Sequence, residues 1–108
     1  MRKRLLWIPT TALIGFSFLM SGQVLAGDDI RDPQQMKAIA ASEGLISLEE
    51  AKQKALAVKP GTIVEAELDR RKWPAGWDYE FEIIDANGVE WEIDIDAKTG
   101  EVRKLKID

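Results

Sequence analysis

After Gly61 the chain alternates apolar and acidic residues with a period of two. A two-residue period is that of a β-strand, in which successive side chains point to opposite faces. Three long runs of this kind are followed by a shorter one at about 101–105. The apolar positions of the long runs are Val64, Ala66, Leu68, Trp77, Tyr79, Phe81, Ile83, Val89, Trp91, Ile93 and Ile95. The pattern predicts a four-stranded antiparallel meander sheet with one apolar face and one wet face.

The positions between these apolar residues are all acidic. They are Glu65, Glu67, Asp69, Asp78, Glu80, Glu82, Glu90, Glu92 and Asp94. Carboxylates that lie directly opposite one another repel and cost stability. Two interpretations of this face stay open: a docking surface for a cationic partner or for cations, and a solvated face that keeps an exposed sheet soluble. In either case we expect the face to be flat and wet, without a cleft that would raise the pKa of a carboxylate.

The first tight turn sets the register of the two central strands. A two-residue loop at 87–88 would mix the two faces, whereas a three-residue loop at 86–88 pairs Ile83 with Trp91. We therefore expect Gly88 to be the left-handed residue of a bulged turn.

The second tight turn, D-A-K-T-G-E, sets the register of the last strand. A four-residue loop pairs Ile95 with Val102 and places Arg103 opposite Asp94. Gly100 then occupies a position of positive φ, which glycine adopts at little cost.

Before the first strand the apolar spacing is that of a helix. Ser47 and Glu50 form an S-x-x-E capping box at its start, and the Pro-Gly pair at 60–61 ends it. A shorter helix runs from an N-cap at Asp32 to a left-handed Gly44. The predicted class is α+β: one main helix packed on one face of the four-stranded sheet, with the short helix lying over the domain.

The first 26 residues have the layout of a secretory signal. Three basic residues at 2–4 precede an apolar run at 5–20, and small residues lead up to Ala26. The alternative is an uncleaved anchor, but the apolar stretch of about 16 residues is shorter than the roughly 20 that span a bilayer. We expect cleavage after Ala26, a polar lead-in with the short helix at 27–45, and one main domain at 46–108. The protein would be periplasmic or secreted.

Composition removes several classes of function. Residues 27–108 hold twelve basic residues against nineteen acidic ones, a net charge of −7, which disfavours nucleic acid and anionic lipids as partners. The chain has no His and no Cys, so it lacks the Ser-His and Cys-His nucleophile systems and the usual zinc and haem ligands. We expect a protein that is not an enzyme, with no catalytic residues, no cofactor and no dedicated metal ligands.

Four segments together resemble a known family. They are S-L-E-E-A at 47–51, P-G at 60–61, Y-E-F-E-I at 79–83 and D-I-D-A-K-T-G-E-V at 94–102. In this order and spacing they resemble the PepSY domain, the peptidase propeptide and YpeB-type domain, over about 46–106. The resemblance implies a helix packed on an antiparallel sheet, and a role in inhibiting or regulating a peptidase or another partner. It brings no catalytic residues with it.

Two further segments are candidate binding features. The loop at 70–76 could present Trp73 and Arg71 as a binding tip, since Trp and Arg are favoured at hot spots; alternatively, Trp73 folds back over the end of the sheet. The D-x-D-x-K segment at 94–98 is not a calcium loop, because its lysine and glycine are misplaced for one. The candidate partner-binding residues are Glu65, Glu67, Glu80, Glu82, Glu90, Glu92, Asp94, Trp73 and Arg71.

The leading hypothesis is an interaction module that binds another envelope protein, such as a peptidase or a sensor. An extended segment of the partner could add to an edge strand, at 62–70 or 101–106. The alternative is a periplasmic binder of small ligands or cations that uses the acidic side of the sheet.

The signal hypothesis predicts the start of the exported protein. N-terminal sequencing or intact-mass measurement of the exported form should find Gly27 as the first residue, because the small residues before it suit the signal peptidase. Recovery of the full-length chain from the membrane fraction would contradict cleavage.

Overall fold

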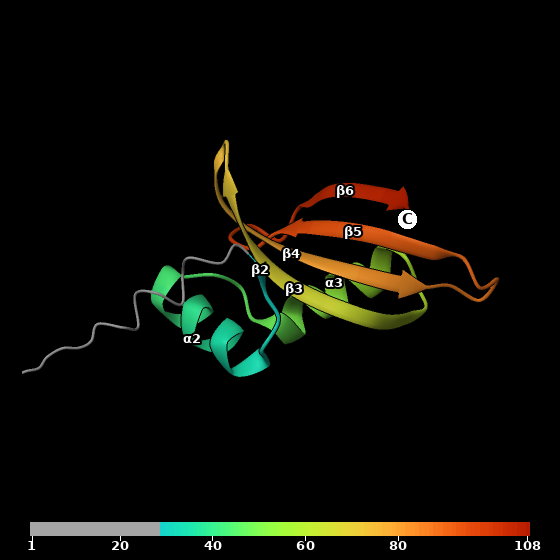
Figure 1. Ribbon diagram of the computed structural model, residues 1–108, viewed down its shortest axis with the longest axis horizontal. Helices are drawn as coiled ribbons and strands as arrows, with labels where there is room; N and C mark the ends of the chain where they lie inside the picture. Colours follow the sequence, from blue (N-terminus) through green and yellow to red (C-terminus); the bar gives the residue numbers. More distant parts are fainter. Residues whose placement is uncertain (1–28) are drawn as a thin grey trace, which may run out of the picture.

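The computed structural model describes residues 29–108; the signal segment and its cleavage site lie outside the described residues. The described residues form two helices and five strands (Figure 1). These are β2 (Asp29–Ile30), α2 (Pro33–Glu43), α3 (Leu48–Val58), β3 (Thr62–Lys72), β4 (Ala75–Ile84), β5 (Glu90–Asp96) and β6 (Val102–Ile107). The strands lie side by side in sequence order, and every neighbouring pair is antiparallel.

The predicted α+β class, with a helix on an antiparallel sheet, is confirmed, but the count of four strands is wrong. Asp29 and Ile30, which we assigned to a polar lead-in, pair with Asp69 and Leu68 of β3. Two residues are too few to show a period of two. Ile30 nevertheless joins the core, with 4% of its surface exposed.

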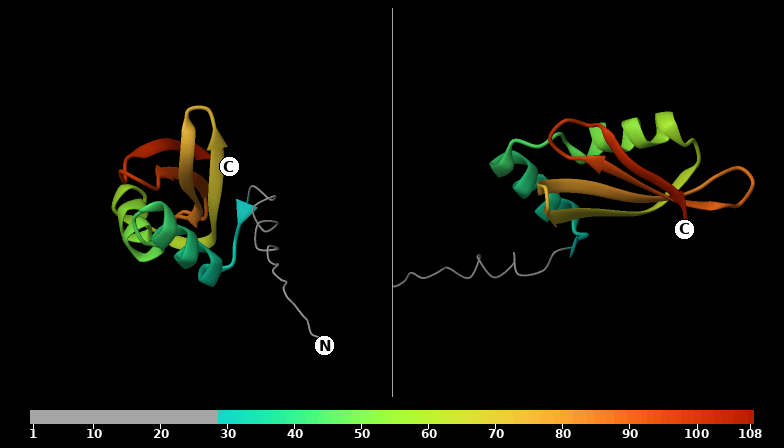
Figure 2. Two further views of the ribbon diagram at one scale, coloured as in Figure 1. Left: turned by 90° about the vertical axis from the view of Figure 1, so that its left-hand side faces the viewer. Right: turned by 90° about the horizontal axis from the view of Figure 1, so that it is seen from above.

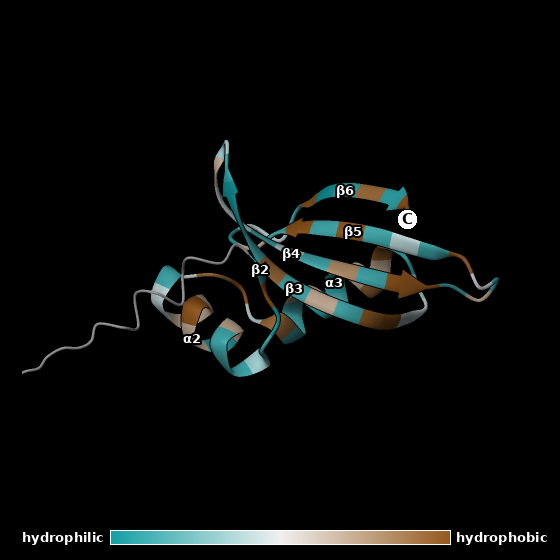
Figure 3. Ribbon diagram, in the orientation of Figure 1, coloured by the Kyte–Doolittle hydropathy of each residue, from teal (hydrophilic) through white to brown (hydrophobic). Residues whose placement is uncertain are grey.

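Helix α3 lies across one face of the sheet, as Figure 2 shows in its right-hand view. The helix contributes the fully buried Ala51 and Ala55, whose small side chains let it approach the strands closely. Hydropathy alternates along the strands (Figure 3). The largest fully buried side chains are Tyr79, Phe81, Met36, Leu68, Ile83, Ile93 and Ile95.

Ile46 ties the start of α3 to the sheet through both of its backbone polar groups. Its carbonyl accepts the Tyr79 hydroxyl at 2.7 Å, and its N–H donates to the Ala97 carbonyl at 2.8 Å. Next to it, the Ser47 hydroxyl accepts the N–H of Glu50 at 3.1 Å, which confirms the predicted N-cap. The buried tyrosine hydroxyl is thereby satisfied, as a buried polar group requires.

The register predicted for β4 and β5 is confirmed. Ile83 faces Trp91, Phe81 faces Ile93, and the loop between the strands spans residues 86–88. Gly88 has a φ of 81°, in the left-handed region.

Two register shifts correct the prediction elsewhere. One lies between Ile63 and Glu65 of β3; it leaves Val64, which we assigned to the core, 51% exposed. The other lies between Asp94 and Ile95, so that Lys104 rather than Arg103 stands opposite Asp94. A bulge inserts one extra residue into a strand, and the alternation of side chains does not show which residue it is.

Gly100 and Gly88 make a matched pair for a test of turn strain. Gly100 has a φ of 84°, but a Cβ there would lie 2.7 Å from Lys54 Cε, whereas at Gly88 it would meet nothing within 4 Å. Each Gly→Val variant should lose about 1–3 kcal/mol through its positive φ, and Gly100→Val should lose slightly more, because the flexible end of Lys54 has to move aside. Denaturant unfolding measures both. Lys54→Ala should remove the excess; if the two losses are equal in the wild-type background, the packing of Lys54 on Gly100 is not significant.

Candidate functional site

The face of the sheet opposite α3 is the main candidate site, and we call it the acidic face. It carries the nine predicted carboxylates: Glu65, Glu67, Asp69, Asp78, Glu80, Glu82, Glu90, Glu92 and Asp94. In the observed register Glu67 lies directly opposite Glu80, and Glu80 directly opposite Asp94. Like charges therefore face one another across three strands, which is unfavourable unless protons or cations compensate.

The acidic face is not uniformly wet, which corrects our expectation. Four of its carboxylate residues are buried: Glu67, Asp78, Glu92 and Asp94, each exposing 9% or less. Long cationic side chains from the edges of the sheet lie over them. At one edge, Arg31 follows β2 and contacts Glu65 at 3.1 Å and Glu67 at 2.8 Å.

At the opposite edge, β6 supplies lysines. Lys104 Nζ lies 3.7 Å from Glu92 Oε2 and 3.6 Å from Asp94 Oδ2. Lys106 Nζ lies 3.7 Å from Glu92 Oε1. The acidic face thus has cations at its rim and carboxylates at its centre.

Arg71 belongs to an internal ion-pair network, and its role as a partner-binding residue stays a prediction. Its guanidinium, with 14% of the side chain exposed, binds Asp78 and Asp96. Arg103 binds the other oxygen of Asp78 at 3.0 Å. Gly76, opposite Arg71 in the hairpin, makes room for this arrangement, because a Cβ there would overlap the guanidinium.

Trp73 is 89% exposed at the tip of the β3–β4 hairpin, so it does not fold back over the sheet. The hairpin projects upward in Figure 1. Because Arg71 is directed toward Asp78 and Asp96, the structure does not assemble the predicted binding tip of Arg71 and Trp73.

The Asp96 side chain accepts backbone hydrogen bonds within its own turn. Its Oδ1 accepts the N–H groups of Lys98 at 2.8 Å and Thr99 at 3.0 Å, and its Oδ2 accepts Arg71. These bonds organise the turn that leads into β6.

Glu80 lies at the centre of the acidic face, beside the Glu92 carboxyl. A hydrogen bond with the Glu92 carboxyl, together with burial, raises the pKa of Glu80 to about 9. The same hydrogen bond lowers the pKa of Glu92. Burial raises the pKa of Asp69 to about 7 and that of Asp94 to about 6. The pKa of Glu82 rises to about 7, chiefly through a hydrogen bond with Glu90.

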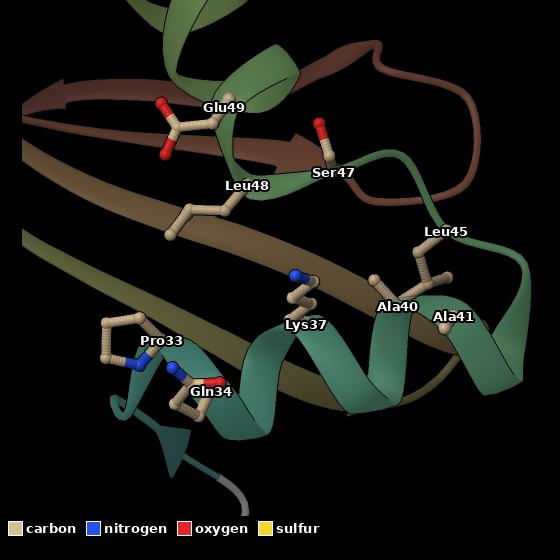
Figure 4. A pocket seen from close by; sticks show the side chains of 9 residues that line it. All are labelled: Pro33, Gln34, Lys37, Ala40, Ala41, Leu45, Ser47, Leu48 and Glu49. Carbon is tan, nitrogen blue, oxygen red and sulfur yellow. The ribbon is translucent and has the colours of Figure 1, made fainter.

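A groove of about 530 Å³ lies between α2 and α3 (Figure 4). Its lining residues are Pro33, Gln34, Lys37, Ala40, Ala41, Leu45, Ser47, Leu48 and Glu49. Ser47 provides the one hydroxyl among these residues, and it already caps α3. The groove therefore offers an apolar surface rather than a nucleophile with a base.

The sequence predicted the edge strand β6 but not the exposure of its apolar side chains. Val102, Leu105 and Ile107 are 42%, 41% and 61% exposed. They stand opposite the apolar Ile95, Ile93 and Trp91 of β5, so the apolar face of the sheet continues onto an edge that remains exposed.

Comparisons with known proteins agree with the fold. The PepSY family, described as "Peptidase propeptide and YPEB domain", matches residues 45–106. "Uncharacterized protein YkoJ" of Bacillus subtilis (strain 168) is 37% identical over 79 residues, which are 73% of this chain and 44% of that protein. The chain therefore covers less than half of that relative's length. No solved structure matches the chain. Within residues 29–108, no helix is long and apolar enough to span a membrane.

The raised pKa of Glu80 predicts that the folded protein becomes less stable as pH rises from acidic to alkaline values. Between the ordinary Glu pKa of 4.5 and the folded value of about 9, the folded protein binds more protons at Glu80 than the unfolded chain does. Stability therefore falls as pH rises through this window. Without divalent cations, the melting temperature should be higher at about pH 5.5 than at about pH 8.5.

Glu80→Gln should raise the melting temperature at the higher pH and flatten the profile. Glu49→Gln is the control, because Glu49 lies on α3, away from the acidic face, with 79% of its side chain exposed. A wild-type protein that becomes more stable toward alkaline pH would contradict the raised pKa of Glu80.

Proposed function

This chain belongs to the PepSY family, and we propose that it is a non-catalytic, exported interaction module. It regulates a peptidase or another envelope protein by binding an extended segment of that protein along β6. The observation that supports this proposal best is the coincidence of unpaired backbone groups and exposed apolar side chains on β6. Export is supported by the signal-like composition of the first 26 residues.

The backbone of β6 can accept another strand. Asp108 N–H donates to the Glu90 carbonyl at 2.9 Å, and Lys106 and Lys104, two and four residues before it, stand opposite Glu92 and Asp94 in the same register. Hydrogen-bonded and non-hydrogen-bonded pairs alternate in an antiparallel ladder. The N–H and C=O groups of Leu105 and Ile107 therefore point away from β5, toward any added strand.

The side chains of β6 indicate what an added strand should look like. Leu105 and Ile107 offer apolar surface on the side of the sheet that α3 covers elsewhere. Lys104 and Lys106 lie on the acidic face, with 49% and 54% of their side chains exposed. A partner segment that alternates apolar and acidic residues would complement both sides, as β5 already does from within the protein.

The other edge of the sheet is less open. β2 pairs with β3 at Leu68 and Asp69, and Arg31 ties the segment after it to Glu65 and Glu67. Protected edges of this kind are how natural sheets avoid unwanted pairing. β6 is thus the better docking edge.

Proline at position 105 tests the edge mechanism. Leu105→Pro removes an N–H that points away from β5, so it costs no ladder bond within the protein. It should weaken binding to a partner captured from an envelope extract by about tenfold or more, because a main-chain bond is lost and the edge is blocked. Leu105→Val is the control, since it keeps the N–H and an apolar side chain. Kinetics on the captured partner provide the measurement.

The same experiment separates the acidic face from the edge. Charge reversal at Glu82 and Glu90 should leave edge binding nearly unchanged, whereas docking of a cationic partner on the acidic face would weaken with reversal and with salt. Glu92 is unsuitable for reversal because it is buried and paired with two lysines. Equal binding by Leu105→Pro and wild type would refute docking along β6.

A further inference from the structure

A cleft of about 520 Å³ lies at the base of the β3–β4 hairpin, which projects upward in Figure 1. Three segments that are distant in the sequence line it: the end of α2 with the connection after it, the hairpin, and the β5–β6 turn. We call it the hairpin cleft. Its described lining includes no residue of β6, so it is separate from the edge proposed for docking. Its volume is in the range of sites that bind small ligands or short peptide segments.

The apolar part of the hairpin cleft comes from Trp77 and Leu45. Both side chains pack against the core but are only partly buried, so some of their surface stays in contact with water. An apolar group that entered the cleft would remove that surface from water, which is favourable. The cleft can therefore hold more than an isolated charge.

Three cationic side chains, Arg70, Arg71 and Lys98, also line the hairpin cleft. Arg70 lies over the Trp77 ring, 5.6 Å from its centroid, and it pairs with no carboxylate among residues 29–108. Lys98 Nζ donates to the backbone carbonyl of Glu43 at 3.3 Å, and it too lacks a carboxylate partner in the described part of the chain. Two cations of the cleft are thus not neutralised.

The acidic residues of the hairpin cleft do not cancel these two charges. Asp96 already accepts Arg71 at 3.3 Å and the N–H groups of Lys98 and Thr99. Glu43 is exposed at the end of α2 and is the one other acid in the described lining. The cleft therefore keeps an excess of positive charge, on a protein whose residues 27–108 are otherwise rich in acids.

We propose that the hairpin cleft binds an acidic segment of a polypeptide. A carboxylate of the segment pairs with Arg70 and Lys98, and a neighbouring apolar side chain contacts Trp77. Charge complementarity favours this ligand, because guanidinium and ammonium groups both bind carboxylates. A nucleic acid would instead extend its phosphates over the acidic surface around the cleft, which repels them. This site goes beyond the proposed docking along β6 and does not depend on it.

A titration of ¹⁵N-labelled protein with the blocked peptide Ac-Glu-Leu-Glu-Leu-NH₂, followed by NMR, tests the proposal. The indole N–H peak of Trp77 should shift and saturate. The peak of Trp91 should stay in place, because its Nε1 donates to Asp85 at 2.9 Å outside the cleft. The neutral peptide Ac-Gln-Leu-Gln-Leu-NH₂ should bind about fivefold more weakly or less, and added NaCl should weaken binding of the acidic peptide.

Substitutions in the lining identify the groups that bind the peptide. Arg70→Gln and Lys98→Gln should each weaken binding by about two- to fivefold, as the loss of an exposed ion pair does. Glu43→Gln should tighten binding by about twofold, because it removes a repelling charge. Lys72→Gln is the matched control: Lys72 is exposed two residues after Arg70 on β3 and does not line the cleft. Its affinity should match that of wild type.

Four results would overturn the assignment. They are an unchanged Trp77 peak, equal binding of the neutral peptide, equal losses with Lys72→Gln and Arg70→Gln, and shifts confined to the amides of Leu105 and Ile107. The last result would support strand addition on β6 while refuting the hairpin cleft, so the two proposals fail separately.

Discussion

The structure depends on one constraint: a sheet with a single apolar face must collect its polar residues on the other. In β3, β4 and β5 nearly all of those residues are acidic, so the alternation that builds the core also brings carboxylates together. The core pairs Phe81 with Ile93, and the same register sets Glu80 against Asp94. A one-residue shift of a strand would move the carboxylates apart, but it would also turn the apolar side chains out of the core. The register that packs the core therefore also keeps the carboxylates opposite one another.

Relief of this repulsion explains the arrangement of the surrounding groups. Arg31 and Lys104 reach inward from the two edges, and Arg71 and Arg103 pair with Asp78. At the centre, the pKa of Glu80 is raised. Protonation relieves the repulsion between neighbouring carboxylates, and this is why the pKa of Glu80 is raised. The acidic face thus keeps carboxyl groups that are only partly neutralised by the cationic side chains around them.

Two surfaces of different physical character follow from the same sheet. The edge of β6 offers unpaired backbone groups and the apolar side chains of Leu105 and Ile107, which suits a macromolecular partner in extended conformation. The acidic face offers closely spaced carboxyl groups with lysines and an arginine at its rim. Lys104 belongs to both surfaces, because it lies on β6 and pairs with Asp94 of the acidic face.

The sequence by itself determined the α+β class, the faces of the three long strands, the β4–β5 register and the left-handed turns at Gly88 and Gly100. These features depend on local period and local turn chemistry, which a sequence displays directly. Only the tertiary structure decided the pairing of β2, the bulge at Val64, the inward direction of Arg71 and the burial of Asp94. Each of these depends on which distant side chains meet and how much water they exclude, and no local pattern encodes that.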